Sequence, residues 1–286
     1  MDLYIAGAAP VSHPKKLTST MILNYPLFSK TTERNQASWY NKFMISKKSI
    51  AYLLQKGVKF PLFDVDGTLI EGGNRAHAES YDFALHTVYH QPTASVEEIQ
   101  THGMIDTQIL IEILKLHGVS EENAKSKIDK ATEAMAQYFE KHKENGTFVV
   151  LDGATDILDE LKKREIPTGL LTGNVEEIGW GKIERAGIRD YFTFGAFGNL
   201  AYRRVDLIKV AQDRLEKMTN TKIPLRHFVI IGDTPLDVAC AKAGGIEVIA
   251  VATGIYSRDE LQKASADLVI DTLHETDKIR NFLKIQ

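Results

Sequence analysis

Residues 60–70 read Phe-Pro-Leu-Phe-Asp-Val-Asp-Gly-Thr-Leu-Ile, a short apolar run that ends in two carboxylates and a glycine. Side chains of a β-strand alternate between its faces, so Asp64 and Asp66 are expected to point the same way, and Gly67 allows a sharp turn. Two like charges this close repel each other unless a cation lies between them or one carboxyl is protonated. Mg²⁺ is the first expectation, because it accepts a few carboxylates beside a phosphate oxygen. A simpler interpretation is that Asp66 only belongs to an Asp-Gly turn.

Two further apolar runs end in small and polar residues. Residues 168–175 read Thr-Gly-Leu-Leu-Thr-Gly-Asn-Val, and residues 227–237 read His-Phe-Val-Ile-Ile-Gly-Asp-Thr-Pro-Leu-Asp. In an open parallel sheet the ligand crevice lies outside the carboxyl ends of the strands, so the three runs should converge on one pocket. The residues that these two runs bring to the pocket are Thr172, Gly173, Asn174, Asp233 and Asp237.

From residue 147 onward, short apolar runs alternate with helical patterns, which predicts an α/β fold with a doubly wound parallel sheet. Pro61 fits a central strand poorly, because proline cannot donate a ladder hydrogen bond. Either the pairing is broken there or the motif is displaced. We expect helices over 155–165, 176–186, 204–218, 235–243 and 258–264, and strands over 168–172, 227–232, 247–252 and 268–270.

An all-helical segment interrupts this alternation. Helical periodicity covers 76–90, 106–117 and 121–144, between the first strand and the second. A bundle packed for stability alone is one interpretation; a lid that excludes water from the crevice is the better one, because the insert lies beside it. The expected domains are a core of residues 44–74 and 147–286, a helical cap of residues 75–146, and an N-terminal extension of residues 1–43.

The extension and the composition limit the partners and the location. Residues 1–43 are rich in Ser, Thr, Asn and Lys; they could be an organellar transit peptide, a disordered or loosely docked extension, or the product of a start assigned too far upstream. We favour a poorly ordered extension without a catalytic role. The net charge of −3 gives no basic field for nucleic acid. Cys240 is the single cysteine and lies among small residues of a helical pattern, so we expect a buried structural thiol rather than a nucleophile. No apolar stretch reaches the roughly 18–20 residues that span a bilayer. We expect a cytoplasmic protein, with organellar targeting and oligomeric state open.

The order and spacing of the motifs resemble the haloacid dehalogenase-like hydrolase superfamily. The pattern Asp-x-Asp-Gly-Thr occurs at 64–68, a Thr at 172, and Gly-Asp-x-x-x-Asp at 232–237, and the likeness extends over roughly 58–285. The insert is similar to the helical cap of phosphoglycolate phosphatase-like members. The resemblance implies a Rossmann-like core with a cap that closes over small substrates.

The resemblance also implies a role for each motif residue. Asp64 would be the nucleophile that forms an aspartyl-phosphate, and Asp66 the general acid and base, which also offers its backbone carbonyl to Mg²⁺. Thr172, with the Gly173 and Asn174 amides, would bind the phosphoryl oxygens; alternatively, Thr172 caps the helix that begins near residue 176. The implied metal residues are Asp64, Asp66, Asp233 and Asp237, the last through a metal-bound water.

The cation of the site is harder to assign. The segment from Phe194 to Leu207 resembles a subset of the superfamily in which alignment places Arg204 at the basic position, with Arg203 as the second choice. Asn199 departs from the usual Ser in that subset. The five candidates are Lys182, Arg185, Arg203, Arg204 and Lys209.

In the cap, residues 102–110 resemble the Gly-x-x-Asp segment of a specificity loop. Gly103 is expected near the ligand, because it allows close approach of the backbone. We expect Asp106 to cap the helix that follows it.

The leading function is Mg²⁺-dependent hydrolysis of a small phosphate monoester. A phosphomutase needs the same nucleophile, metal and acid/base residue, and a catalytically inactive phosphate-binding module is the non-enzymatic alternative. Dehalogenation is disfavoured, because carbon–halogen displacement does not require the metal and phosphate residues. The partner is therefore expected to be a small phosphorylated metabolite that the sequence does not identify.

Overall fold

The structure is a computed structural model that describes residues 46–72 and 75–285. The predicted N-terminal extension, residues 1–43, lies outside the described residues. No helix in the described ranges is long and apolar enough to cross a lipid bilayer.

A six-stranded parallel sheet forms the centre of the molecule, in the order β5-β4-β1-β6-β7-β8. The predicted α/β class with a parallel sheet is therefore confirmed. Strand β1 lies between β4 and β6, so the three sequence motifs end at the same edge of the sheet. The strands are β1 (Phe60–Phe63), β4 (Gly169–Leu171), β5 (Phe194–Ala196), β6 (Phe228–Gly232), β7 (Glu247–Val251) and β8 (Leu268–Ile270).

Pro61 does lie in the central strand, and the register explains why it is tolerated. The Asp64 amide donates to Ile231 of β6, and alternate residues of a strand face the same neighbour, so the nitrogen of Pro61 faces the β4 side. The pairing of β1 with β4 begins only at Leu62, opposite Gly169. Pro61 has no backbone N–H, but its nitrogen lies one residue before the pairing with β4 begins, so that ladder loses no hydrogen bond.

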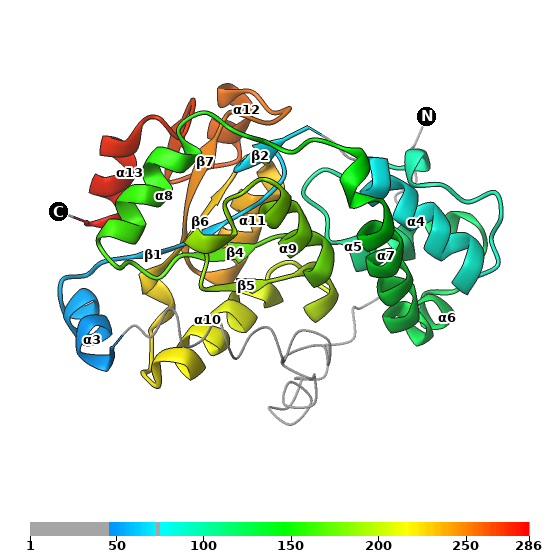
Figure 1. Ribbon diagram of the computed structural model, residues 1–286, viewed down its shortest axis with the longest axis horizontal. Coiled ribbons are helices and arrows are strands. Elements are labelled where there is room, and N and C mark those ends of the chain that lie inside the picture. Colours follow the sequence, from blue (N-terminus) through cyan, green and yellow to red (C-terminus); the bar gives the residue numbers. More distant parts are fainter. Residues whose placement is uncertain (1–45, 73–74, 286) are drawn as a thin grey trace, which may run out of the picture. The chain divides into compact units, whose positions relative to one another are not determined.

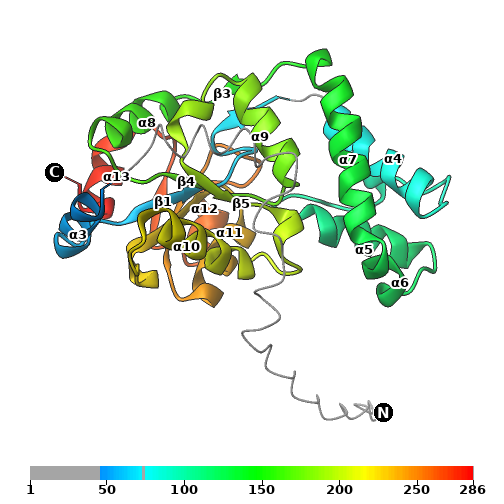
Figure 2. The same ribbon diagram turned by 60° about the horizontal axis from the view of Figure 1, so that its bottom comes forward.

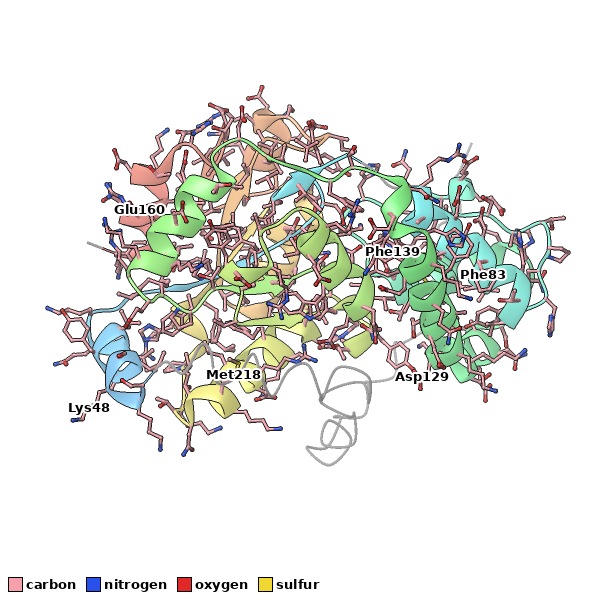
Figure 3. The ribbon with its side chains drawn as sticks, in the orientation of Figure 1. Lys48, Phe83, Asp129, Phe139, Glu160 and Met218 are labelled. Atoms are coloured by element: carbon pink, nitrogen blue, oxygen red, sulfur yellow. The ribbon has the colours of Figure 1, made fainter. Side chains whose placement is uncertain are left out.

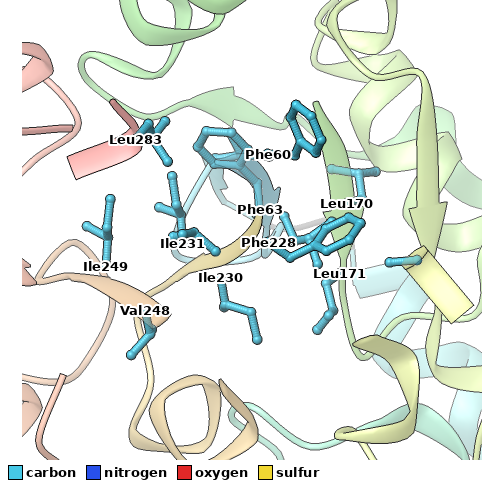
Figure 4. Packing of buried hydrophobic residues seen from close by; sticks show 14 of the residues in the cluster. Phe60, Phe63, Leu170, Leu171, Phe228, Ile230, Ile231, Val248, Ile249 and Leu283 are labelled. Atoms are coloured by element: carbon cyan, nitrogen blue, oxygen red, sulfur yellow. The ribbon is translucent and has the colours of Figure 1, made fainter. Parts of the chain in front are cut away.

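Helices cover both faces of the sheet, and Figures 1 and 2 show α8 and α10 on opposite faces. Phenylalanine, leucine, isoleucine and valine side chains of the strands fill the interior between the sheet and these helices, as Figure 4 shows around Phe60, Ile231 and Leu171. The core helices are α3 (Lys47–Gln55), α8 (Ala154–Lys163), α9 (Glu176–Arg185), α10 (Asp206–Thr219), α11 (Pro235–Gly244), α12 (Arg258–Lys263) and α13 (Thr276–Leu283).

The helical insert packs around a second apolar cluster, which includes Phe139, labelled among the cap helices in Figure 3. The two connections to the core pair as a short antiparallel ladder of β2 (Ile70–Glu71) and β3 (Val149–Val150). The helical pattern predicted over 121–144 is confirmed as two helices rather than one, because the backbone leaves the helical conformation at Lys127. The insert helices are α4 (Arg75–Val88), α5 (Asp106–Leu116), α6 (Glu121–Ser126) and α7 (Ile128–His142).

Candidate active site

The turn after β1 places the first motif. Asp64 is buried, and its amide continues the ladder to Ile231 at 2.9 Å. Gly67 has a φ of +81°, and a Cβ at that position would lie 2.4 Å from Oδ2 of Asp233. Glycine is therefore required both by the left-handed conformation and by the close approach of Asp233.

Three buried carboxylates cluster where β1 and β6 end. Asp64 follows β1, Asp233 follows β6, and Asp237 lies in the first turn of α11; one oxygen of each lies within 4.8 Å of the others. Asp237 is fixed by Thr234, whose backbone N–H and hydroxyl donate to its Oδ2 at 3.1 and 2.7 Å. A donor set made only of carboxylate oxygens can hold a hard divalent cation.

Arg204 is the cation beside this cluster. Its Nη2 donates to Oδ1 of Asp64 at 3.1 Å and to Oδ1 of Asp237 at 2.5 Å, and its Nη1 donates to the carbonyl of Gly103 at 3.1 Å. Arg203 is 69% exposed and pairs with an aspartate three residues further on. The structure therefore places Arg204, and not Arg203, at the carboxylates.

Asp66 has a different set of partners. Nζ of Lys182, from α9, donates to its two carboxylate oxygens at 2.7 and 2.8 Å, and Nδ2 of Asn174 donates to one of them at 2.8 Å. Nδ2 of Asn174 also donates to Oγ1 of Thr172 at 2.7 Å. The side chain of Asp66 thus belongs with an ammonium and an amide rather than with the carboxylate cluster, and its predicted contribution to the metal through the backbone stays a prediction.

The electrostatic surroundings push the pKa values of these carboxyls apart. Burial raises the pKa of Asp64, and the charges of Asp237 and Asp66 raise it further against the opposing effect of Arg204. Burial also raises the pKa of Asp233, helped by the charges of Asp64 and Asp237. For Asp66, desolvation raises the pKa, but the Lys182 ammonium and the hydrogen bonds from Lys182 and Asn174 together outweigh this and leave the pKa below its usual range.

The two glycines predicted at the ligand make close contacts between the core and the cap. A Cβ on Gly173 would lie 2.0 Å from the carbonyl oxygen of Met104, and a Cβ on Gly103 would lie 2.6 Å from Oγ1 of Thr234. Gly103 has a φ of +77°. Both border the same cavity, but these contacts are with the protein itself, so substrate binding by the two glycines stays a prediction.

The prediction that Asp106 caps its own helix is wrong. Ile105 occupies the N-cap of α5, and no side chain bonds there. The carboxylate of Asp106 instead accepts hydrogen bonds from the amide of Val175, just before α9, at 2.7 Å and from the hydroxyl of Tyr81 at 2.6 Å. Asp106 therefore ties the cap to the beginning of a core helix.

The alternative that Thr172 caps α9 is also wrong. Val175 occupies that N-cap without a side-chain bond, and the amide of Glu176 is bound by Oδ1 of Asn199 at 3.0 Å. Asn199, the residue that departs from the related pattern, thus satisfies an amide at the helix N-terminus. The side chain of Thr172 is left to face the cavity and Asn174.

Sequence reasoning did not single out three residues at the site. Lys182 is one of the five candidate cations. The sequence feature that could have favoured it is its position among apolar and glycine residues in a helix that starts at the site. Thr68, within the first motif, donates to Oδ1 of Asp233 at 2.8 Å. His77 of the cap lies 3.0 Å from Nζ of Lys182, and no sequence signal indicates this contact, because it depends on how the cap lies on the core.

The motif residues and the cap enclose one cavity of about 200 Å³. Asp64, Thr172 and Asp233 border it from the core, and His77 and His102 border it from the cap. Its volume lies below the several hundred Å³ of a typical drug-sized ligand site. The cavity therefore suits a small substrate.

Comparison with known proteins agrees with this arrangement. The family model described as haloacid dehalogenase-like hydrolase matches residues 62–251. The phosphoglycolate phosphatase of Chromobacterium violaceum is 24% identical over 240 residues, which cover 77% of this chain and 95% of the relative. That of Pseudomonas fluorescens is 27% identical over 217 residues, covering 74% and 76%. A crystal structure of a predicted phosphatase from Clostridium acetobutylicum has a TM-score of 0.59 at 22% identity, covering 78% of this chain and 99% of that one.

The matched range contains most of the site. It begins at Leu62 in β1, includes both carboxylate motifs, and ends in β7. Because the model matches more than half of the sequence, this chain belongs to the haloacid dehalogenase-like hydrolases.

Proposed function

We propose that this protein hydrolyses a small phosphate monoester through an aspartyl-phosphate on Asp64, with Mg²⁺ as cofactor. The observation that carries the proposal is that the four carboxylates of the site fall into two groups with different cationic partners. Asp64, Asp233 and Asp237 cluster around Arg204, whereas Asp66 is paired with Lys182. A nucleophile beside a metal site and a separate acid/base residue are the two groups that this reaction requires.

The charges of the cluster fit a divalent ion. Three carboxylates against the single guanidinium of Arg204 leave two negative charges in a buried site. Asp64 and Asp233 would hold Mg²⁺ directly, and Asp237 would hold it through water. The ion would neutralise charge that develops on the phosphoryl oxygens.

The residues of the chain account for the remaining requirements. A carboxylate oxygen of Asp64 attacks phosphorus, and the leaving alcohol takes a proton from Asp66. Water then attacks the phosphorus of the aspartyl-phosphate and gives its proton to Asp66, which releases phosphate and restores both carboxyls. Thr172 and the neighbouring amides are proposed to hold the phosphoryl oxygens, since positioning and charge neutralisation contribute most of the catalysis of phosphoryl transfer.

The Lys182 contact bears on the two tasks of Asp66. The ammonium lowers the pKa of Asp66, which suits a base and opposes an acid. A phosphoryl group in the cavity would compete with Asp66 for this ammonium and so favour the protonated form of Asp66 when the leaving group needs a proton. After the alcohol has left, the Lys182 contact would favour the ionised form again, which is the form that can activate water.

The substrate is proposed to be a small phosphorylated metabolite. The curated relatives are phosphoglycolate phosphatases, and the cavity of about 200 Å³ is small and bordered by polar groups. A short phosphorylated acid or alcohol is therefore a better candidate than a nucleotide. The cytoplasmic location remains a prediction of the sequence.

Phosphate release from a panel of phosphate esters, with and without Mg²⁺, tests the proposal. We expect turnover of small esters only with Mg²⁺ and no turnover by Asp64→Asn, which should also fail to trap phosphate covalently. The exposed Asp277→Asn is the matched control and should keep wild-type rates, since its side chain is 81% exposed. Full turnover in excess chelator, or covalent phosphate on the Asp64 variant, would contradict the proposal.

A further inference from the structure

Lys182 lies where the core meets the cap, and its side chain is only 5% exposed. Its ammonium contacts the Asp66 carboxylate, Oδ1 of Asn174 at 2.9 Å and Nδ1 of His77 at 3.0 Å. Of these three partners, only His77 belongs to the cap helices. A lysine ammonium has three N–H donors and no acceptor, so Nδ1 of His77 must accept this hydrogen bond. The imidazole is therefore neutral, with its proton on Nε2.

That proton has a partner in the cap. Nε2 of His77 lies 3.1 Å from Oδ2 of Asp106, so it donates to a carboxylate that is 2% exposed. The Tyr81 hydroxyl and the Val175 amide donate to the same carboxylate and fix its orientation. The N–H of Asp106 donates to the carbonyl of Gly173 at 2.8 Å. Asp106 is thus held against the loop that follows β4, and His77, its partner in the cap, can accept from Lys182 of the core only when the cap lies on the core.

We propose that His77 and Asp106 form a positioning pair that orients Lys182 toward Asp66. This inference rests on the proposed function, because the pair would affect the reaction through proton transfer by Asp66. Asp106 fixes the tautomer of His77, His77 then accepts from Lys182, and Lys182 orients the carboxylate of Asp66. Docking of the cap therefore completes the acid/base residue as well as enclosing the substrate.

The energetics of burial support a role beyond packing. A buried carboxylate is costly unless it is hydrogen-bonded and paired, and an apolar contact of similar volume would stabilise the interface between cap and core at least as well. Asp106 nevertheless lies in that interface with three donors directed at it. His77 borders the cavity and contacts both the Lys182 ammonium and the Asp106 carboxylate. Packing alone does not require these two polar contacts.

The kinetic test compares two substrates, an alkyl phosphate whose leaving group needs a proton and an activated aryl phosphate whose leaving group does not. We expect His77→Ala to lower kcat/KM for the alkyl ester about 10- to 100-fold, and for the aryl ester by a clearly smaller factor. His77→Gln offers an oxygen to Lys182 and an N–H to Asp106, and should restore part of the loss. The matched control is His86→Ala on the same helix, since His86 bonds Ala94 and does not border the cavity.

Two kinetic results would overturn the positioning role. One is an equal loss on both esters. The other is a His77→Ala variant whose thermal stability falls while the ratio of kcat/KM between the esters stays at the wild-type value, since a merely structural contact would behave in that way.

A second measurement does not depend on activity. In protein labelled with ¹⁵N-histidine, the imidazole resonances of His77, assigned by their absence in His77→Ala, should show the neutral tautomer protonated at Nε2. Asp106→Asn should shift that tautomer equilibrium. An imidazolium or the Nδ1-protonated tautomer at neutral pH would overturn the pair whether or not any ester is hydrolysed. The expected tautomer in a protein that hydrolyses no ester would contradict the proposed function alone, and the shift in Asp106→Asn would still decide whether the pair exists.

Discussion

Asp64 and Asp66 are two residues apart, yet their surroundings give them different chemistry. Asp64 shares its site with two carboxylates and the Arg204 guanidinium, and burial raises its pKa. The Lys182 ammonium lowers the pKa of Asp66 against the effect of desolvation. Titratable groups whose surroundings push their pKa values apart are a common basis for separate catalytic roles.

Asp66→Asn should separate these roles. The amide is nearly isosteric with the carboxylate, and the three clustered carboxylates remain, so binding of Mg²⁺ and phosphate should persist. Proton transfer should be lost, which is worth about 10²- to 10⁴-fold in rate. The measurement is kcat/KM for esters with leaving groups of increasing basicity, and the loss should be largest for the most basic. A uniform loss would mean that Asp66 is not the leaving-group acid.

Short elements impose geometric requirements that a sequence pattern shows only in part. Pro61 is tolerated in β1 because its nitrogen faces β4, and the pairing of β1 with β4 begins only at the next residue. Helical periodicity did not reveal the break at Lys127, because one residue outside the helical conformation leaves the spacing of apolar residues nearly intact. The turn after β1 is stricter, since Gly67 meets both a conformational and a steric requirement.

Gly67→Ala tests the steric requirement, with Gly118→Ala as the matched control. Both glycines have a positive φ, of +81° and +76°, but a Cβ on Gly118 would meet no atom within 4 Å. In each variant, an alanine held in the left-handed conformation should lower the free energy of unfolding by about 1–2 kcal/mol. Only Gly67→Ala should also displace Asp233 and lose Mg²⁺-dependent activity. Denaturant titration and phosphate release measure the two effects, and equal activity of the variants would contradict the assigned contact.

At the scale of the whole molecule, metal binding should be coupled to stability. The folded protein gathers Asp64, Asp233 and Asp237 in one buried cluster, which the unfolded chain does not. A ligand that binds only the folded state stabilises it by about 2.7 kcal/mol when its free concentration is 100-fold above Kd. We therefore expect Mg²⁺ to raise the Tm by several degrees.

Ca²⁺ should support little activity in the phosphate-release assay, because Ca²⁺ is larger than Mg²⁺ and less strict in its coordination geometry.

The effect of Mg²⁺ should grow as the pH rises. Burial raises the pKa of Asp64 to about 7 and that of Asp233 to about 8 in the folded state, so the contribution of these two carboxyls to the stability of the metal-free protein is fully present at low pH and is lost as the pH rises toward those values. Mg²⁺ removes this loss by neutralising the ionised carboxylates. Thermal denaturation over a pH series measures the effect, and Asp233→Asn is the control that should abolish most of it. A Tm gain that is independent of pH would argue against binding at this cluster.

The sequence by itself determined the α/β class, the family and the main carboxylates, because local patterns carry this information. An apolar run followed by Asp-x-Asp-Gly predicts a strand end with a site, and the parallel order of the strands brings Asp64, Thr172 and Asp233 to one edge of the sheet. The burial of Cys240, which raises its thiol pKa to about 12, agrees with the expectation of a structural thiol.

Only the tertiary structure decided which cation meets which carboxylate. Arg203 and Arg204 are adjacent in sequence, but only the second points into the carboxylate cluster. The contact of Lys182 with His77, and that of Val175 with Asp106, join the core to a separately packed cap. No local pattern encodes such contacts, since they arise from the packing of two apolar clusters that bring distant segments together.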